Sequence, residues 1–295
     1  MTSPLVIRGL QASDIPTVTA WARQEGFAPG SGDVAIYRQT DRQGLWMGWL
    51  DQEPVGCIAA VRYNPDYAFI GMFLVVPHQR GKGYGLALWR HALRRLGDVP
   101  CIGLEAAPDR VDDYAGWGFR PSSATTRWQR SGGASPGATS SSSQPDPPAC
   151  LLTGEAIPEA VVQRFDAQRE PSPRPHFLHQ WLQHPAGTVH ALLDRQGACH
   201  GFGRIRPCLL KEREGWRIGP LVADQPSAAR ALLEGLLQRH RGPVLIDVPG
   251  ANPEAGPVLE ELGFDPRSQT LRMYRGEVPR VSLADVYGLA CLELG

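Results

Sequence analysis

The chain has 295 residues, and its 30 lysine and arginine residues balance 30 aspartate and glutamate residues, so the formal charge at pH 7 is zero. This balance argues against a nucleic-acid partner, because nucleic-acid-binding domains usually present a basic face. Hydrophobic residues make up 42% of the sequence, enough for ordinary packed cores. The length favours two domains over one.

The cysteines and the apolar runs indicate in which cellular compartment the protein is expected. The six cysteines show no metal-ligand spacing, so we expect buried free thiols and no metal site. The N-terminal segment MTSPLVIRGL lacks the basic stretch and long apolar core of a signal peptide. No apolar run is long enough to span a bilayer. We therefore expect a cytoplasmic protein without a membrane partner, and its oligomeric state stays open.

Strand and helix patterns alternate through the first 130 residues. The expected elements are, in chain order, a strand at 5–10, a helix opened by Ser13-Asp14 that runs to about 25, a helix capped by Asp33, strands at 45–50, 55–63 and 67–76, a helix at 84–96, a strand at 101–105, a helix at 109–117, and a strand or hairpin arm at 120–130. Short turns join the strands between 45 and 76, which predicts an antiparallel meander.

Residues 131–149 have a different composition, SGGASPGATSSSSQPDPPA. Serine, glycine, alanine and proline without a periodic apolar face cannot bury enough surface to order themselves. A structureless loop of this length is uncommon inside a compact domain. We therefore expect a flexible linker between a domain at 1–130 and a domain at 150–295.

The second half repeats the pattern of the first. Its expected elements are helices at 158–168 and 176–184, strands at 188–194, 198–209 and 216–222, a helix at 225–241, a strand at 244–249, a helix at 252–262 and strands beyond 265. The motif GWGF, which ends at Phe119, returns as ELGF, which ends at Phe264. Internal repetition of this kind outranks single motifs as evidence of fold.

Three alternating glycines separate a predicted strand from a predicted helix, in the sequence FLVVPHQRGKGYGLALW. Glycines at Gly81, Gly83 and Gly85 allow the backbone to approach a ligand and to direct several N–H groups at one point. The unpaired N–H groups and the dipole of the following helix favour an anion there. Arg80 and Lys82 add positive charge. The junction is typical of a phosphate or pyrophosphate site.

Two common phosphate motifs do not fit this junction. A P-loop requires serine or threonine after Gly-Lys, whereas Gly83 and Tyr84 follow Lys82 here. A dinucleotide fingerprint requires its third glycine one residue later than Gly85. It also follows the first strand of a parallel sheet, whereas the strands before this loop form an antiparallel meander.

The run from Arg80 to Gly85 fits the pattern R-x-x-G-x-G directly after an apolar strand. This pattern resembles the acetyl-CoA loop of the GNAT N-acetyltransferase superfamily, and the order of elements across residues 5–130 resembles the same family. The second half carries a weaker resemblance to the C-terminal domain of tandem GNAT-like proteins, through IDVP, ELGF, RMYRG and YGLACLELG. The resemblance implies an α/β (α+β) protein of two tandem GNAT-like domains, each a mixed, mostly antiparallel sheet flanked by helices.

The resemblance also implies the residues that bind acetyl-CoA. The loop N–H groups would hold the pyrophosphate, the preceding strand would lie beside the pantetheine arm, and one of its N–H groups would polarise the thioester carbonyl. The implied cofactor-binding residues are Phe73, Leu74, Val75, Val76, Arg80, Gly81, Lys82, Gly83, Tyr84 and Gly85.

Acetyl transfer needs an uncharged amine and a proton for the departing thiolate. Tyr114 stands four residues before Gly118, which matches the family tyrosine that acts as general acid; the alternative is a half-buried tyrosine that only packs. Glu105 ends a strand and could deprotonate the amine, or be an ordinary solvated acid. His78 and His91 are expected at the surface.

Two further acids flank the loop EGFAPGSGD, where acceptors often enter such enzymes. Glu25 and Asp33 could contact the acceptor, although acids in such positions are more often caps or solvated. The acceptor itself carries no visible motif.

The second half lacks the features of this chemistry. Its junction reads ADQPSAA, without glycine or a basic residue, and Asp224 is expected to cap the helix. Leu259 stands where Tyr114 stands in the first half. We therefore expect a degenerate second domain and acetyl-CoA-dependent N-acetylation at the first. The acceptor would be an amine on a small molecule, a peptide or a protein. The alternatives are a non-catalytic acyl-CoA-binding or regulatory module and an O-acetyl- or longer-chain acyltransferase.

Overall fold

The computed structural model describes residues 4–132 and 149–295. Most of the predicted linker, residues 133–148, lies outside the described part. The first half contains β1 (Val6–Gly9), η1 (Ala12–Asp14), α1 (Ile15–Gln24), α2 (Asp33–Thr40), β2 (Leu45–Leu50), β3 (Glu53–Arg62), β4 (Tyr67–Val75), η2 (Pro77–Gln79), α3 (Tyr84–Leu96), β5 (Cys101–Ala106), η3 (Pro108–Arg110), α4 (Val111–Ala115) and β6 (Arg120–Arg130).

The second half repeats this order of elements. It contains β7 (Ala149–Thr153), η4 (Gly154–Ala156), α5 (Glu159–Ala167), α6 (Pro175–Gln183), β8 (Thr188–Asp194), β9 (Cys199–Leu209), β10 (Glu214–Ala223), α7 (Pro226–Leu237), β11 (Val244–Pro249), α8 (Ala255–Glu261), β12 (Asp265–Gly276) and β13 (Val286–Gly288). The predicted meander and the predicted helix at 84–96 are therefore present.

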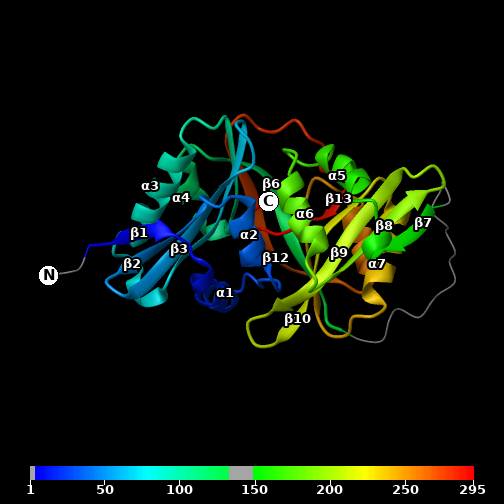
Figure 1. Cartoon of the computed structure of the whole chain (residues 1–295), viewed down its shortest axis with the longest axis horizontal. Helices are drawn as coiled ribbons and strands as arrows, with labels where there is room; N and C mark the ends of the chain where they lie inside the picture. Colours follow the sequence, from blue (N-terminus) through cyan, green and yellow to red (C-terminus); the bar gives the residue numbers. More distant parts are fainter. Residues whose placement is uncertain (1–3, 133–148) are drawn as a thin grey trace.

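The described strands form one continuous 13-stranded sheet (Figure 1). Its order is β1-β2-β3-β4-β5-β12-β6-β11-β10-β9-β8-β7, and β13 pairs with β10 off this path. Most pairs are antiparallel, while β4 with β5 and β10 with β11 are parallel. The expected fold class, a mixed and mostly antiparallel sheet flanked by helices, is confirmed.

Each half contributes one strand to the sheet of the other half, β6 from the first and β12 from the second. Strand β12 pairs with β5 along Leu271–Gly276, and β6 pairs with β11 along Thr125–Arg130. The cores follow the same exchange: Met273 packs with the first-half core under α3, and Trp128 packs with the second-half core. The two halves thus share their central strands, an arrangement that the local sequence pattern did not predict.

Buried charges also join the halves. Arg206 of β9 donates two hydrogen bonds to the Asp33 carboxylate, one from Nε and one from a terminal nitrogen, each at 2.8 Å. Both side chains are fully buried. Asp247 of β11 accepts hydrogen bonds from Arg127 at 2.7 and 3.0 Å and from Arg217 at 2.8 Å. Because a buried charge left without its partner is strongly destabilising, these pairs fix how the halves meet.

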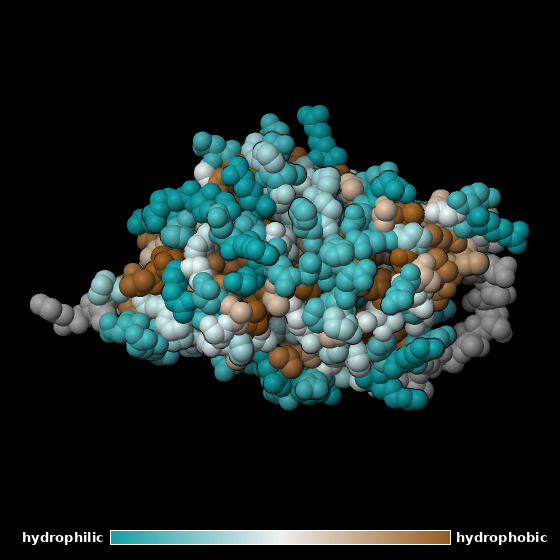
Figure 2. All heavy atoms as spheres, in the orientation of Figure 1, coloured by the Kyte–Doolittle hydropathy of each residue, from teal (hydrophilic) through white to brown (hydrophobic). Residues whose placement is uncertain are grey.

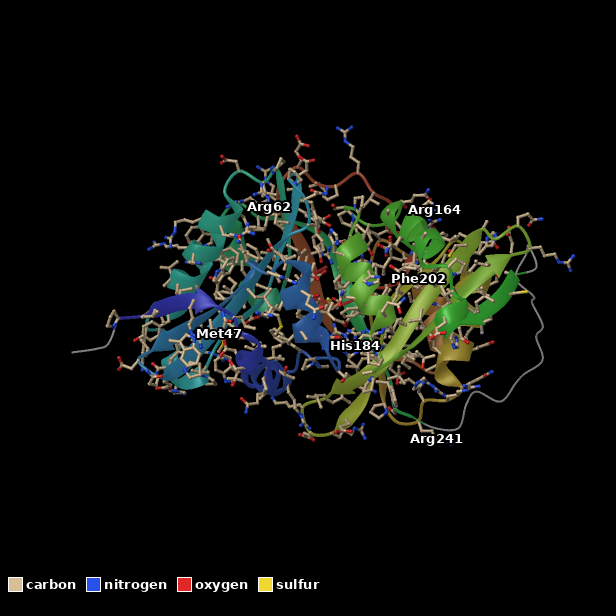
Figure 3. All side chains as sticks on the ribbon, viewed as in Figure 1. Met47, Arg62, Arg164, His184, Phe202 and Arg241 are labelled. Atoms are coloured by element: carbon tan, nitrogen blue, oxygen red, sulfur yellow. The ribbon has the colours of Figure 1, made fainter. Side chains whose placement is uncertain are left out.

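The chain ends between the two halves (Figure 1). Strand β13 pairs with β10, and the residues after it enter the first-half core through Ala290, Cys291 and Leu294. In Figure 3, Met47 lies among the side chains of the first half and Phe202 among those of the second. The C-terminal segment therefore contacts both halves and connects their cores.

The surface, the helices and the thiols of the described residues bear on the expectations from composition. Figure 2 shows a largely hydrophilic face with scattered hydrophobic residues, which is normal for a protein surface. Within residues 4–132 and 149–295, no helix is long and apolar enough to cross a membrane, and no cluster of acids, histidines and cysteines could hold a metal ion. All six cysteines are unpaired. Cys150 is exposed and Cys199 is half-buried, so burial of every thiol was a wrong expectation.

Candidate functional site

The glycine loop lies at the start of α3. Gly81 has φ of 76° and Gly83, the helix N-cap, has φ of 86°, so both adopt the left-handed conformation that favours glycine. An added Cβ at either position would meet no atom within 4 Å, so the backbone faces open space. The first N–H groups of α3 have no intrahelical acceptor. The loop therefore presents an uncovered anion-binding surface at the N-terminus of a 13-residue helix.

A bulge in β4 opens the sheet beside this loop. Gly71 pairs with Ala59 and Leu74 with Cys57, so Met72 and Phe73 together oppose a single residue of β3, and Met72 has φ of 46°. A bulge of this kind bends its strand. The parallel pairing of β4 with β5 ends at Ile70. Beyond it the strands separate, and the β5-facing N–H groups of residues 71–75 have no strand partner.

A cavity of about 840 Å³ fills this gap and reaches the glycine loop. Its walls come from β4, the loop, α3, β5 and α4 of the first half. The second half adds β11, β12 and the C-terminal segment. Of the predicted cofactor-binding residues, those that line it are Phe73, Leu74, Val75, Arg80, Gly81, Gly83 and Gly85. Val76, Lys82 and Tyr84 do not line it.

The α3 face beside the cavity differs from the predicted one. The spacing of Leu86, Trp89, Leu93 and Leu96 predicts one buried face for this helix. Trp89 and Leu96 are buried, but Leu86 is 44% exposed and lines the cavity. Leu88 and Ala92 take the buried positions instead. The helix is therefore rotated slightly from the predicted apolar face, which leaves an apolar side chain next to the loop.

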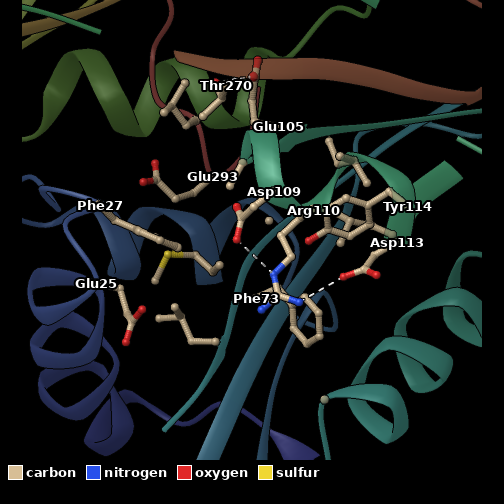
Figure 4. Close-up of a pocket in the computed structure, with 18 of the residues that line it drawn as sticks. Glu25, Phe27, Phe73, Glu105, Asp109, Arg110, Asp113, Tyr114, Thr270 and Glu293 are labelled. Atoms are coloured by element: carbon tan, nitrogen blue, oxygen red, sulfur yellow. Dashed lines mark hydrogen bonds and ion pairs between the residues drawn. The ribbon is translucent and has the colours of Figure 1, made fainter. Parts of the chain in front are cut away.

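Tyr114 lines the cavity from α4 (Figure 4). Its ring packs against Trp89, with ring centroids 5.2 Å apart, and against Phe119 at 6.4 Å. Burial raises the pKa of Tyr114 to about 12, because the phenolate would lose its hydration. At neutral pH the hydroxyl therefore keeps its proton and can donate it to a group in the cavity.

Glu105 lies just beyond the last β4–β5 pair and is held tightly. Its carboxylate accepts hydrogen bonds from Arg272 at 2.7 Å, Thr270 at 2.8 Å and Thr125 at 3.1 Å. The side chains of Glu105 and Arg272 are 2% and 3% exposed. All three donors are groups of this chain, and one of them is the buried Arg272. This geometry favours a structural role, that of joining β5 to the exchanged strands.

The basic side chains of the loop already have partners. Arg80 donates its Nε to the Val75 carbonyl at 2.8 Å and pairs through its terminal nitrogen with Glu25. Lys82 donates to the Gln79 side chain at 2.9 Å. Glu25 lines the cavity from the end of α1, opposite Tyr114 in Figure 4. The loop and the α1 side of the cavity are thus linked by an ion pair.

The other singled-out residues lie away from the cavity. Asp33 was expected to cap a helix, but the N-cap is Gly32, and the Asp33 carboxylate binds Arg206 and the Gly30 N–H in the core. His78 is exposed and contacts Glu53 at 2.8 Å. His91 packs edge-on against Trp46.

Several cavity residues could not be found from the sequence of the first half. Thr270 of β12, Asp247 of β11 and Leu292 and Glu293 of the C-terminal segment all line it. The Tyr37 hydroxyl donates to Glu293 at 3.2 Å. These residues reach the cavity only through the exchanged strand and the returning C-terminus, and no local motif marks either.

The equivalent gap in the second half is occupied by the chain itself. Strand β13 pairs with β10 at Leu221 and Val222, and the Leu289 N–H donates to the Asp247 carbonyl at 2.8 Å. Leu259, which replaces the tyrosine, is buried in the core. Asp224 was expected to cap α7, but the N-cap is Gln225, and the Asp224 carboxylate contacts His200 at 2.8 Å.

Two family profiles match the chain. One, described as Acetyltransferase (GNAT) family, matches residues 15–115, and another, described as Acetyltransferase (GNAT) domain, matches residues 162–288. Holothin acyltransferase from Pseudoalteromonas sp. (strain SANK 73390) is 30% identical over 282 residues, which cover 94% of this chain and 90% of that protein.

Solved structures share the fold across nearly the whole chain. A candidate acetyltransferase from Pyrococcus horikoshii superposes with a TM-score of 0.79 at 22% identity and covers 99% of this chain and 96% of its own. A tandem GNAT protein from the clavulanic acid biosynthesis pathway superposes with a TM-score of 0.60 at 17% identity, over 92% of this chain and 98% of its own. At these identities the likeness concerns the fold alone.

Proposed function

Because this chain belongs to the GNAT superfamily of acyltransferases, we propose that its first half binds acetyl-CoA and transfers the acetyl group to an amine. The observation that carries the proposal is a single cavity that joins the glycine loop, the opened edge of β4 and Tyr114. Acetyl-CoA supplies an activated thioester, and the chain supplies binding, polarisation and a proton.

The residues at the loop fit the phosphate end of such a ligand. Gly81 and Gly83 leave their backbone uncovered, and the start of α3 adds N–H donors and positive potential. A Cβ added at Gly85 would lie 3.4 Å from the side chains of Phe73 and Val75. A larger side chain at this position would therefore narrow the entrance to the cavity. We assign pyrophosphate binding to this loop, and contacts along the arm of the ligand to Phe73, Leu74 and Val75.

The chemistry is a direct displacement. The uncharged amine attacks the thioester carbonyl carbon, a C–N bond forms, the C–S bond breaks, and the nitrogen loses a proton while the sulfur gains one. A β4 N–H beyond Ile70, where pairing with β5 has ended, would be suited to stabilise the negative charge on the carbonyl oxygen. Tyr114 keeps its proton at neutral pH and is the donor to the departing sulfur. We do not assign the proton acceptor to Glu105, because Arg272 holds its carboxylate.

A second candidate function, transfer of an acyl group longer than acetyl, also has support. The relative that covers most of this chain carries the name acyltransferase, and its name gives holothin as the acceptor. A longer acyl group is therefore the alternative to acetyl for this chain, and holothin is one acceptor to test. O-acylation has no comparable support.

A matrix of acyl donors and acceptors tests the proposal. Thiol release would be followed with acetyl-CoA and longer acyl-CoAs, each against holothin, a panel of small amines, amine-bearing peptides and a matched set of alcohols. We expect acceptor-dependent release with at least one amine and acetyl-CoA. Preference for a longer donor would select the alternative. Binding of acetyl-CoA without release in any combination would identify a binding module instead of an enzyme.

A further inference from the structure

The ion pair between Arg80 and Glu25 connects the glycine loop, where we place acetyl-CoA, with the end of α1 on the other side of the cavity. Arg80 belongs to the glycine loop, and Glu25 follows the last residue of α1. Both residues line the cavity, and their side chains are 47% and 32% exposed. The pair is therefore accessible to a ligand that enters from the loop.

The guanidinium carries one positive charge, so it can neutralise only one of two anions placed beside it. Its Nε is already committed to the Val75 carbonyl at 2.8 Å, which fixes the arginine against the end of β4. A pyrophosphate bound by the neighbouring N–H groups would bring two negative charges to the same guanidinium, against one on the Glu25 carboxylate. Phosphate and Glu25 thus compete for Arg80.

We propose that acyl-CoA binding takes Arg80 away from Glu25 and so releases the Glu25 carboxylate to position the acceptor amine. This inference rests on the proposed function, since it assigns a role to each substrate of that reaction. Glu25 is a positioning residue, and Arg80 is the element shared by the two substrates. The acceptor class that fits is an amine with a positive charge or an N–H donor at the α1 end of the cavity.

Other carboxylates of the cavity are less suited to this role. Glu105 is bound by Arg272, and Asp247 is bound by two arginines, with exposed side-chain fractions of 2% and 1%. Their arginine partners, Arg272, Arg127 and Arg217, do not belong to the glycine loop. Glu25 is the cavity carboxylate that pairs with a residue of the glycine loop.

The binding test is a double-mutant cycle read by calorimetry with acetyl-CoA. Glu25→Gln removes the competitor, so acetyl-CoA should bind about two- to fivefold more tightly, the range expected for losing an exposed ion pair. In an Arg80→Ala background the same substitution should change the affinity by less than about 1.5-fold, because the shared group is gone. Thermal unfolding of each variant would verify that it folds.

A matched control separates this competition from general electrostatics. Glu53 is another exposed acid near the loop, it pairs with His78, and it does not line the cavity. Glu53→Gln removes the same charge and should leave acetyl-CoA affinity unchanged. Equal tightening by Glu53→Gln and Glu25→Gln would overturn the proposal, and so would weaker or unchanged binding in Glu25→Gln.

The acceptor side is tested by steady-state kinetics with an amine that the wild-type enzyme acetylates. Glu25→Gln should raise the KM for the amine several-fold while kcat changes less, and Glu25→Asp should recover part of the loss. An unchanged KM would overturn the positioning role. If no amine is turned over at all, the proposed reaction fails, whereas the calorimetric cycle still decides whether Glu25 and phosphate compete.

Discussion

Burial keeps the Tyr114 hydroxyl protonated across the physiological range, since its pKa rises to about 12. A protonated hydroxyl beside aromatic rings can donate to a developing thiolate without itself carrying charge. Glu105, although it lies near the same opening, is neutralised by Arg272. At the scale of single residues, the sequence singles out both positions as candidates, and the structure adds the partners of each, aromatic rings around Tyr114 and Arg272 beside Glu105.

Removing the Tyr114 hydroxyl should slow the reaction without disturbing the fold. Tyr114→Phe retains the ring that packs on Trp89, so acetyl-CoA affinity and the melting temperature should change little. We expect turnover to fall roughly tenfold or more, because the hydroxyl would no longer act as general acid. Stopped-time assays of thiol release would measure this. Wild-type turnover in Tyr114→Phe would show that water or another group supplies the proton.

The raised pKa of Tyr114 also predicts a dependence on pH. The ordinary tyrosine value is 10, and the folded value is about 12, so the unfolded chain ionises first. The contribution of this group to stability is complete below pH 10 and declines as the pH rises above it. Urea unfolding at pH 9 and pH 11 should show a smaller pH-dependent loss in Tyr114→Phe than in wild type. An equal loss in both would contradict this assignment.

Because Glu105 pairs with Arg272, we expect substitution of Glu105 to lower the stability of the fold, and we do not expect it to act by removing a catalytic base. Glu105→Gln leaves the buried Arg272 without a counter-charge, so the free energy of unfolding should fall by about 3–5 kcal/mol. Replacing both, as in Glu105→Leu with Arg272→Met, should recover much of that loss. Glu53→Gln at the surface is the control. Full stability with abolished turnover in Glu105→Gln would instead restore the role of general base.

At the scale of elements, periodicity and turn residues were sufficient for most of the secondary structure. The helix expected at 84–96 is α3, Tyr84–Leu96, and the predicted meander is β2 to β4. These elements depend on neighbours in sequence. The positions of β12 and β6 depend on partners far along the chain, and each strand shows the same alternation whichever sheet it joins. The pairing therefore could not be predicted from local pattern.

The glycine loop offers a test with an internal control. Gly83→Val should abolish measurable acetyl-CoA binding, because a side chain would cover the N–H groups at the start of α3. The left-handed φ of 86° adds strain of about 1–2 kcal/mol. Gly97 ends the same helix, with φ of 54° and open space around it.

Gly97→Val carries at least as much backbone strain, because ψ of −121° places Gly97 outside the left-handed helical region that Gly83 adopts, and it does not approach the cavity. It should lower the melting temperature at least as much and leave acetyl-CoA affinity intact. Circular dichroism and calorimetry on the pair would separate strain from ligand exclusion. Acetyl-CoA affinity in Gly83→Val equal to that of wild type would remove the loop from the binding site.

At the scale of the whole molecule, the second half completes the first. It supplies β12 beside β5 and part of the cavity wall, and its own gap is closed by β13. We expect one acetyl-CoA per chain, bound at the first half, as measured by equilibrium titration. Two equivalent sites, or binding by an isolated 150–295 fragment, would contradict this.

Strand exchange also predicts the result of cutting the chain. A 1–132 fragment would leave the inner edge of β5 uncovered and β6 without β11 and β12. We expect this fragment to be insoluble or poorly folded alone, and to recover acetyl-CoA binding when it is co-expressed with 149–295. A monomeric, well-folded 1–132 fragment with native affinity would show that the exchanged strands are dispensable.

The crossing of β6 and β12 has a consequence for how the protein is made. A ribosome delivers β5 and β6 long before β12, which lies between them in the sheet. Until β12 emerges, the nascent first half presents an unpaired strand edge that other strands can join. The cavity wall can therefore be completed only after β12 has been made. Termination of translation before β12 would release an aggregation-prone intermediate that lacks part of the cavity.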